Sequence, residues 1–479
     1  MLPRLWPGGH FSSIDAATLS YLRDKLGVDF VWYTGVIDHA TTWSCPQVKP
    51  SNPQIVKGDA GSPYAIRNYF DVAPYLASDV SHRMEEFEDL VRRTHEAGLK
   101  VIIDFIPNHV SRDYCGTLGR GDDKNVHWAP GNDFFYYPGE ALALPVPNDG
   151  EPFYENPAKA SGNAFTPRPS VTDWYETVKL NYCPFHTPTW DKMLGALRFW
   201  ASKGVDGFRC DMVELVPYEF LQWAIERMKA EFPGIIFIAE VYEKEKYGLY
   251  SNTVGFDYLY DKSGLYDTLR AVCCENKTAR SISWNWQFLG ELQGRMLNFL
   301  ENHDEQRIAS DFFLGSAEAG YAALGVSLLM NSAPFMLYFG EEVGERGMDD
   351  EPFSGVNGRT SIFDWWKVGS LHRLREWIDD KRKGLTRSER AVLKRYTEAL
   401  ELSRRPVFRE GEFYDLCYMQ EEGFDMDRHY AFLRRNASEC WLVAANFSST
   451  DASITVRTPD EGTHTQMVPA MDFVAERIR

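Results

Sequence analysis

Residues 204–216 read GVDGFRCDMVELV, and this stretch carries the pattern that decides the fold. A short apolar run ends in polar side chains and lies between two segments, 190–203 and 218–231, that each have an apolar and a charged face. Parallel strands joined by crossover helices have this pattern. The same pattern recurs along the chain and predicts an α/β fold. The clearest strands are expected at 28–33, 101–106, 207–211, 235–240, 256–260, 296–301 and 335–340, and further helices at 16–26 and 84–97.

Eight such strands would close a (β/α)₈ barrel, and the only place left for an eighth is the start of the chain, at 2–6.

Two stretches interrupt the alternation of strands and helices. Residues 111–188 are rich in Gly, Pro, Asn, Asp and aromatics, which indicates an irregular domain inserted after the third strand. The region 391–479 has short alternating segments typical of an antiparallel β-sandwich. We therefore expect the barrel to comprise 1–110 and 189–390.

Charge and composition exclude several classes of protein. The 479 residues include 69 Asp and Glu against 51 Lys and Arg, a net charge of −18 that disfavours nucleic acids and anionic membranes as partners. No apolar run is long enough to span a bilayer. The first residues show no signal-peptide pattern, which predicts a cytoplasmic protein, with an exported mature form as the alternative. Eight cysteines without a C-x-x-C pair predict free thiols.

Polar residues at the ends of barrel strands are the ones to inspect, because the active sites of such barrels lie at the carboxyl ends of the strands. In 101–110, VIIDFIPNHV, Asp104 lies within a strand and His109 follows it. In the opening stretch, Arg209 and Asp211 alternate to the same side of their strand. A guanidinium there would keep a carboxylate ionised and nucleophilic. Taken singly, these residues are also typical of caps and structural ion pairs.

Two further strand ends carry carboxyl groups. Glu240 ends five apolar residues, a setting that raises a carboxyl pKa and allows proton donation near neutral pH. His303 and Asp304 follow the seventh strand. Carboxylates that only form independent structural ion pairs would not be expected to converge from separate strands at one end of the barrel. Two carboxyl groups with opposed protonation demands are what glycoside hydrolysis requires.

Four blocks make the chain resemble the α-amylase family of glycoside hydrolases over nearly its whole length. They are DFIPNH (104–109), GFRCD (207–211), IAEV (238–241) and FLENHD (299–304), in the same order as the conserved regions of that family. The segment SPYAIRNYFDVAP (62–74) is similar to the family's segment with a sugar-stacking Tyr. The resemblance implies the following roles: Asp211 as nucleophile, Glu240 as general acid/base, Asp304 as the third carboxylate, Arg209 orienting Asp211, Asp104 supporting Arg209, His109 and His303 binding the sugar, and Tyr64 stacking under it.

The activity implied by the resemblance is retaining hydrolysis of α-1,4 bonds in starch-type oligosaccharides or maltodextrins. The partner expected is therefore an α-glucan oligosaccharide. A 4-α-glucanotransferase would use the same covalent intermediate and is the main alternative. A non-catalytic glucan-binding relative is a third possibility, although such proteins usually lose a carboxylate and all three are present here.

Calcium is the one cofactor that the resemblance raises. Asn108 stands where many family members place a calcium ligand between the barrel and the inserted domain. Leu215 stands four residues after Asp211, where several amylases have a His whose carbonyl also binds the ion. Calcium binds oxygen ligands only, and the remaining ones would have to come from the insert.

Overall fold

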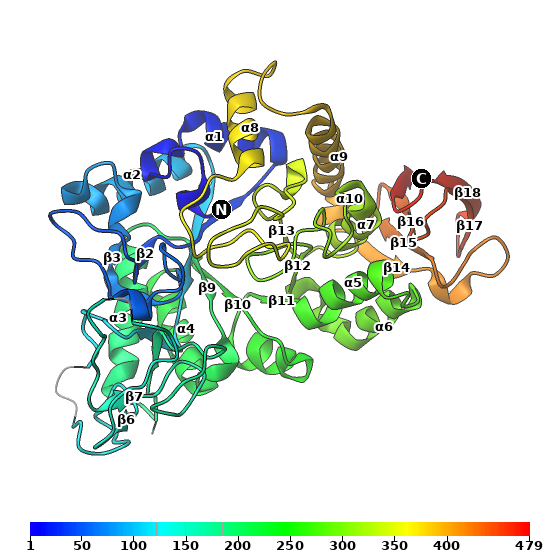
Figure 1. Ribbon diagram of the computed structural model, residues 1–479. Helices are drawn as coiled ribbons and strands as arrows, with labels where there is room; N and C mark the ends of the chain where they lie inside the picture. Colours follow the sequence, from blue (N-terminus) through cyan, green and yellow to red (C-terminus); the bar gives the residue numbers. More distant parts are fainter. Residues whose placement is uncertain (120–122, 149, 184) are drawn as a thin grey trace.

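The computed structural model describes residues 1–119, 123–148, 150–183 and 185–479 (Figure 1). Its central sheet has seven parallel strands in the order β1-β4-β9-β10-β11-β12-β13, which confirms the barrel fold. The strands are β1 (Phe30–Tyr33), β4 (Lys100–Phe105), β9 (Gly207–Cys210), β10 (Ile236–Ala239), β11 (Tyr258–Tyr260), β12 (Met296–Phe299) and β13 (Phe335–Met336).

Helices connect and cover these strands. In α2 the side chains of Phe87, Leu90, Val91 and Thr94 are buried on one face, as the apolar spacing of this segment predicts. The α-helices are α1 (Ala16–Ser20), α2 (Arg83–Glu96), α3 (Pro188–Ser202), α4 (Tyr218–Glu231), α5 (Asp267–Cys274), α6 (Arg280–Leu289), α7 (Tyr321–Leu329), α8 (Gly369–Asp379), α9 (Arg387–Ser403) and α10 (Pro406–Arg409). A π-helix, Tyr21–Leu26, continues α1.

The strand expected at 2–6 is not formed, and that prediction is wrong. Pro3–Leu5 is a 3₁₀ helix that starts on Pro3, whose ring fixes φ and whose nitrogen cannot donate to a neighbouring strand. Of the expected strand region, only its neighbour Met1 bonds along this edge in the described part of the chain. Its nitrogen donates to Trp32 O of β1 over 2.7 Å, and its carbonyl accepts from Thr34 N, directly after β1, over 2.9 Å.

The register of the sheet brings the predicted site residues to one level. Asp104 on β4 pairs with Arg209 on β9, and Cys210 pairs with Ala239 on β10. The next residue on each strand continues the ladder: Asp211 N donates to Phe105 O (2.9 Å), and Glu240 N donates to Cys210 O (3.1 Å). Backbone pairing therefore places these residues side by side at the carboxyl ends of the strands.

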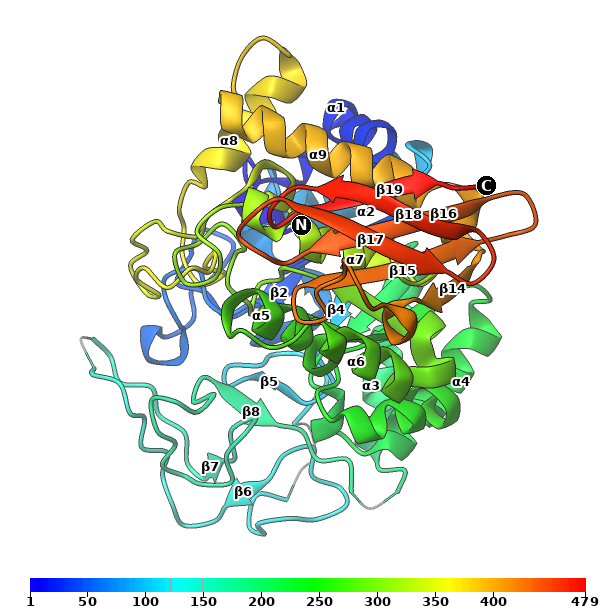
Figure 2. The same cartoon turned by 90° about the vertical axis from the view of Figure 1, so that its right-hand side faces the viewer.

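The stretch after β4 has little regular structure. Two short antiparallel pairs are formed, β5 (His109–Ser111) with β8 (Thr177–Lys179) and β6 (Tyr136–Tyr137) with β7 (Ala158–Lys159). Figure 2 shows this stretch extending away from the barrel helices. The buried Arg112 side chain holds it together by donating to Tyr175 O and to Glu155 Oε1 (2.7 Å).

The end of the chain forms antiparallel sheets that pack near α7 and α9 (Figure 2). The four-stranded sheet has the order β14-β15-β16-β19, and β17 pairs with β18. Their bounds are β14 (Glu412–Asp415), β15 (His429–Arg435), β16 (Cys440–Asn446), β17 (Ala452–Thr458), β18 (Gly462–Val468) and β19 (Phe473–Arg477). A further two-stranded sheet, β2 (Ile37–His39) with β3 (Ile66–Val72), lies beside the barrel.

Among the described residues, we find no helix that combines the length and the apolar character needed to cross a bilayer.

Candidate active site

The guanidinium of Arg209 is the centre of the site. It is fully buried, and its shortest contacts are to two carboxyl groups that directly follow β9 and β10. Nη1 donates to Asp211 Oδ1 over 2.6 Å, and Nη2 forms an ion pair of 2.7 Å with Glu240 Oε1. Since one planar group reaches both, the carboxyl groups of Asp211 and Glu240 face the same small volume.

Asp104 lies near the same nitrogen, Nη1, that donates to Asp211. Its Oδ1 is 3.4 Å from Arg209 Nη1 and accepts from Tyr64 OH over 3.4 Å. The indole Nε1 of Trp32 donates to Oδ2 over 2.9 Å. Burial raises the pKa of Asp104, against the nearby positive charge of Arg209. The arrangement fixes the orientation of the Asp104 carboxyl group and, through it, that of the guanidinium.

Aromatic rings enclose the guanidinium. Its Cζ lies 5.4 Å from the ring centres of Trp32 and Tyr64 and 5.5 Å from that of Tyr260, and Nε donates to Tyr260 OH over 3.3 Å. Trp32 and Tyr260 were not among the predicted site residues. Tyr260 ends β11 and Trp32 is the last residue but one of β1, so the position of each near the end of a barrel strand is the signal that could have found them.

Glu240 is buried and has three partners. Besides Arg209, Oε1 accepts from Tyr242 OH and Oε2 from Met212 N, each over 2.9 Å. Met212 directly follows Asp211 and has a left-handed backbone (φ 45°), which is rare for a residue with a side chain. The bond from its N–H to Glu240 couples the positions of the two carboxyl groups. Nothing in the sequence marked Tyr242 or Met212.

Asp304 is linked to the Arg209 cluster by contacts of His303. His303 Nε2 lies 3.1 Å from Asp304 Oδ2, and its ring stacks on Tyr64 with the ring centres 5.1 Å apart. Tyr64 in turn contacts Asp104, so His303 and Asp304 lie next to the Arg209 cluster. The Asp304 side chain is about half exposed (48%), whereas those of Asp211 and Glu240 are buried. The partly exposed carboxylate of Asp304 is therefore accessible to a ligand that enters from solvent.

Burial and two neighbouring charges act on the pKa of Asp211. Burial and the charge of Glu240 raise the pKa of Asp211, while Arg209 opposes the shift. The sequence predicted a carboxylate that Arg209 keeps ionised. The contact is formed, but the net direction is upward because two carboxyl groups share one guanidinium in a desolvated site.

His109 lies at the edge of the insert. Burial, together with the charges of Lys179 and Lys57, lowers the pKa of His109 to about 3, so the imidazole is neutral. Asn108 Nδ2 donates to its Nδ1 over 3.1 Å, and the ring lies 5.1 Å from that of Trp174. In the insert, Trp174 thus contacts a predicted site residue, while Phe134 and Tyr136 are buried in packing.

The calcium site expected at Asn108 does not fit the residues present. Lys179 Nζ donates to Asn108 Oδ1 and to Leu215 O (2.7 Å), the two oxygens that an ion there would share. An ammonium group in this position excludes a divalent cation by volume and by charge repulsion. Within the described residues, no group of three or more His, Cys, Asp or Glu side chains is arranged to hold a metal ion.

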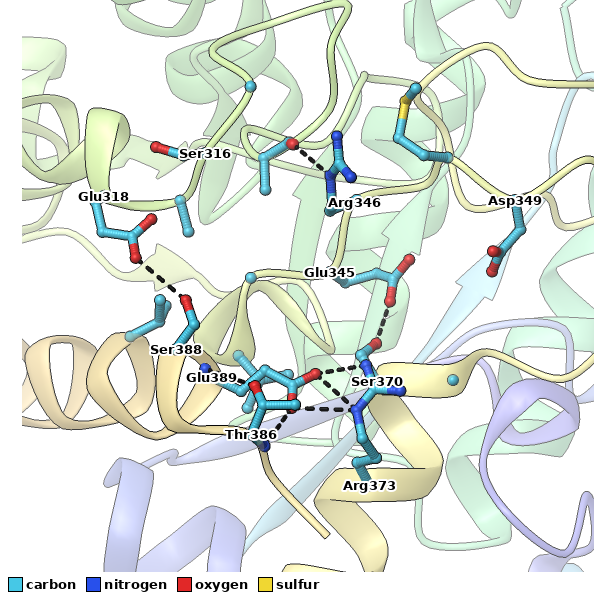
Figure 3. A pocket seen from close by; sticks show the side chains of 18 residues that line it. Ser316, Glu318, Glu345, Arg346, Asp349, Ser370, Arg373, Thr386, Ser388 and Glu389 are labelled. Carbon is cyan, nitrogen blue, oxygen red and sulfur yellow. Dashed lines mark hydrogen bonds and ion pairs between the residues drawn. The ribbon is translucent and has the colours of Figure 1, made fainter.

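A separate pocket of about 720 Å³ lies between the segments 315–318 and 343–349 and the starts of α8 and α9 (Figure 3). None of the predicted site residues lines it. Its charged side chains largely pair with neighbours: Arg373 with Glu389, Glu345 with Ser370, and Glu318 with Ser388. It therefore offers few free groups for chemistry.

Comparison with known proteins adds family membership to this geometry. The family model described as the alpha amylase catalytic domain matches residues 14–398. Alpha-amylase 3 of Dictyoglomus thermophilum is 27% identical over 325 residues, covering 64% of this chain and 59% of that protein. Alpha-amylase MalA of Haloarcula japonica is 28% identical over 359 residues, covering 71% of this chain and 42% of that protein. The chain thus spans about half the length of these two relatives.

One solved structure shows the same fold along the whole chain. The noncanonic maltogenic alpha-amylase AmyB from Thermotoga neapolitana superposes with a TM-score of 0.66 at 18% identity. The superposition covers 100% of this chain and 96% of that one. At this identity, the likeness concerns the fold.

Proposed function

Because the chain belongs to the α-amylase family of glycoside hydrolases, we propose that it is a retaining hydrolase that cuts α-1,4-glucosidic bonds in starch-type oligosaccharides or maltodextrins. The observation that carries this proposal is the contact of one buried guanidinium, Arg209, with both Asp211 and Glu240. A nucleophile and a proton donor must flank one glycosidic bond, and this contact holds them at the same place.

In the proposed reaction, Asp211 attacks the anomeric carbon and forms a covalent glycosyl-enzyme. Glu240 protonates the departing glycosidic oxygen in this step. In the second step, Glu240 takes a proton from a water molecule, and that water releases the sugar from Asp211. The Met212 N–H and the Tyr242 hydroxyl hold the Glu240 carboxyl group in place through both steps.

The remaining residues bind the sugar in this proposal. Tyr64 and His303 form a stacked pair beside Asp104, where Tyr64 can cover one face of the ring. Asp304 accepts from sugar hydroxyl groups, with His303 holding it by an ion pair. His109, which is neutral, donates or accepts one hydrogen bond from the side of the insert. The barrel, 1–110 and 189–390, would thus carry the chemistry, the insert, 111–188, would line the mouth, and the sandwich, 391–479, would lie apart from it.

Products formed from maltotriose test the proposal. Hydrolysis predicts glucose and maltose, with the newly formed reducing end initially in the α configuration. Oligosaccharides longer than maltotriose would instead identify the chain as a glucanotransferase. Binding of maltotriose without any product would identify a non-catalytic glucan-binding protein.

A further inference from the structure

Lys179 occupies a junction of three segments. It ends β8 in the insert and lies opposite His109 of β5 in the register. Its Nζ donates to Asn108 Oδ1, directly before β5, and to the carbonyl of Leu215 over 2.7 Å. Leu215 ends the short 3₁₀ helix Val213–Leu215 that follows Asp211. The ammonium group therefore links the insert to the segments after β4 and after β9.

The partners of Lys179 are of the kind that a hard metal ion would use. An amide oxygen and a backbone carbonyl oxygen are neutral dipolar ligands that calcium also accepts. In the described part of the chain, no carboxylate lies within ion-pair distance of Lys179. Its charge is therefore met by oxygen dipoles, and Asn108 Oδ1 and Leu215 O would be left facing each other without a donor if the ammonium group were removed.

Three buried carboxylates of the insert are paired with basic side chains. Glu176 pairs with Lys57 over 3.0 Å, Glu155 pairs with Arg112 over 2.7 Å, and Asp133 pairs with Lys192 of α3. All three acidic residues are buried. The charges of these three buried carboxylates are thus already neutralised by basic side chains of the chain itself.

We infer that Lys179 acts as a built-in cation that joins the insert to the barrel, so that this junction needs no calcium ion. Because Asn108 also donates to His109, the same contact helps to position an imidazole at the mouth of the site. The inference does not rest on the proposed hydrolysis and can be tested without measuring activity.

The first test uses the unmodified full-length protein. Its Tm is measured in three samples: untreated protein, protein with excess EDTA and protein with excess CaCl₂. Its calcium content is measured by elemental analysis after dialysis. We expect one common Tm and no stoichiometric calcium. A filled site would raise Tm by several degrees, since a ligand that binds only the folded state stabilises it. A Tm that falls with EDTA and recovers with calcium would overturn the inference.

The second test compares Lys179→Met with Lys124→Met, which changes an exposed lysine of the same insert. Methionine keeps the length of the side chain and removes the charge and the donors. We expect Tm to fall by about 3 °C or more for K179M, and the insert to be cut faster by a low level of protease. K124M should match the unmodified protein in both measurements. If K179M melts and is cut like K124M, Lys179 does not hold the junction. If K179M does not fold, the first test still decides.

Discussion

The barrel mouth and the insert meet around His109, but different interactions position their side chains. At the mouth, Asp104, Arg209 and Asp211 take their places from a continuous parallel ladder. In the insert, the regular pairs are only two and three residues long, and buried charged side chains such as Arg112 and Lys179 make the connections. The backbone therefore aligns the chemical groups, whereas side-chain contacts shape the wall beside them.

This difference predicts where a substitution acts. A change in a group aligned by the ladder should alter the chemical step while the fold persists. A change in the insert should alter binding and local stability more than the chemical step.

The largest effect is expected from Asp211→Asn. Asparagine has nearly the same shape and still accepts from Arg209, but it is a poor nucleophile, so activity should fall by at least about 10⁴-fold. Initial rates on maltotriose and a melting curve are the measurements. Near-normal rates in a folded variant would refute the role of Asp211.

The next effect concerns pH. Asp211 must be ionised to attack, so kcat/KM falls as pH drops through its pKa. Burial and the charge of Glu240 raise this pKa, so the acid limb should lie above about 3.9, the usual value for an aspartate. Arg209→Met removes the opposing positive charge and should move the acid limb to still higher pH.

Arg307→Met is the matched control for this pH profile. Arg307 is also fully buried and pairs with Glu301 over 2.8 Å, but it contacts neither Asp211 nor Glu240. Both variants should lose stability, by about 3–5 kcal/mol, because each leaves a buried carboxylate without its partner. The R209M variant alone should shift the acid limb. Equal shifts in both would assign the effect to general loosening of the fold.

A smaller effect is expected from Trp32→Phe. The ring over Arg209 is kept, but Asp104 Oδ2 loses its indole donor, which costs about 1–3 kcal/mol for a buried carboxylate. We expect kcat/KM to fall roughly tenfold or somewhat more. Trp200→Phe is the control, because its indole donates to the carbonyl of Tyr69 and not to a site carboxylate. This variant should lose stability but keep its kcat/KM.

The smallest effect is expected from Trp174→Leu, in the insert. Its ring contacts His109 and can reach the sugar from the side of the insert. KM should rise several-fold with little change in kcat. Phe134→Leu, a buried packing position in the same insert, should lower Tm and leave KM unchanged. A fall in kcat for W174L would mean that the insert takes part in the chemical step after all.

The sequence predicted most of the barrel because apolar runs and helical faces repeat there with a simple period. It also predicted the buried carboxyl groups, since a charged residue at the end of an apolar strand is unusual. It failed at 2–6, where Pro3 starts a 3₁₀ helix.

Contacts that depend on tertiary structure could not be predicted in this way. Lys179 follows no motif, and its partners Asn108 and Leu215 are distant in the sequence. Tyr242 and the left-handed Met212 are also positioned by their neighbours and not by a local pattern. The balance of burial, Glu240 and Arg209 at Asp211 needed the three groups in place.

The most direct test of the central claim is to identify the residue that carries the sugar. In the proposed mechanism, the Glu240→Gln variant lacks the base for the second step. It can be treated with an α-glucosyl fluoride, whose leaving group needs little protonation. Peptide mass mapping should then find one glucosyl group on Asp211. A label on another residue, or none while the substrate is consumed, would contradict the account.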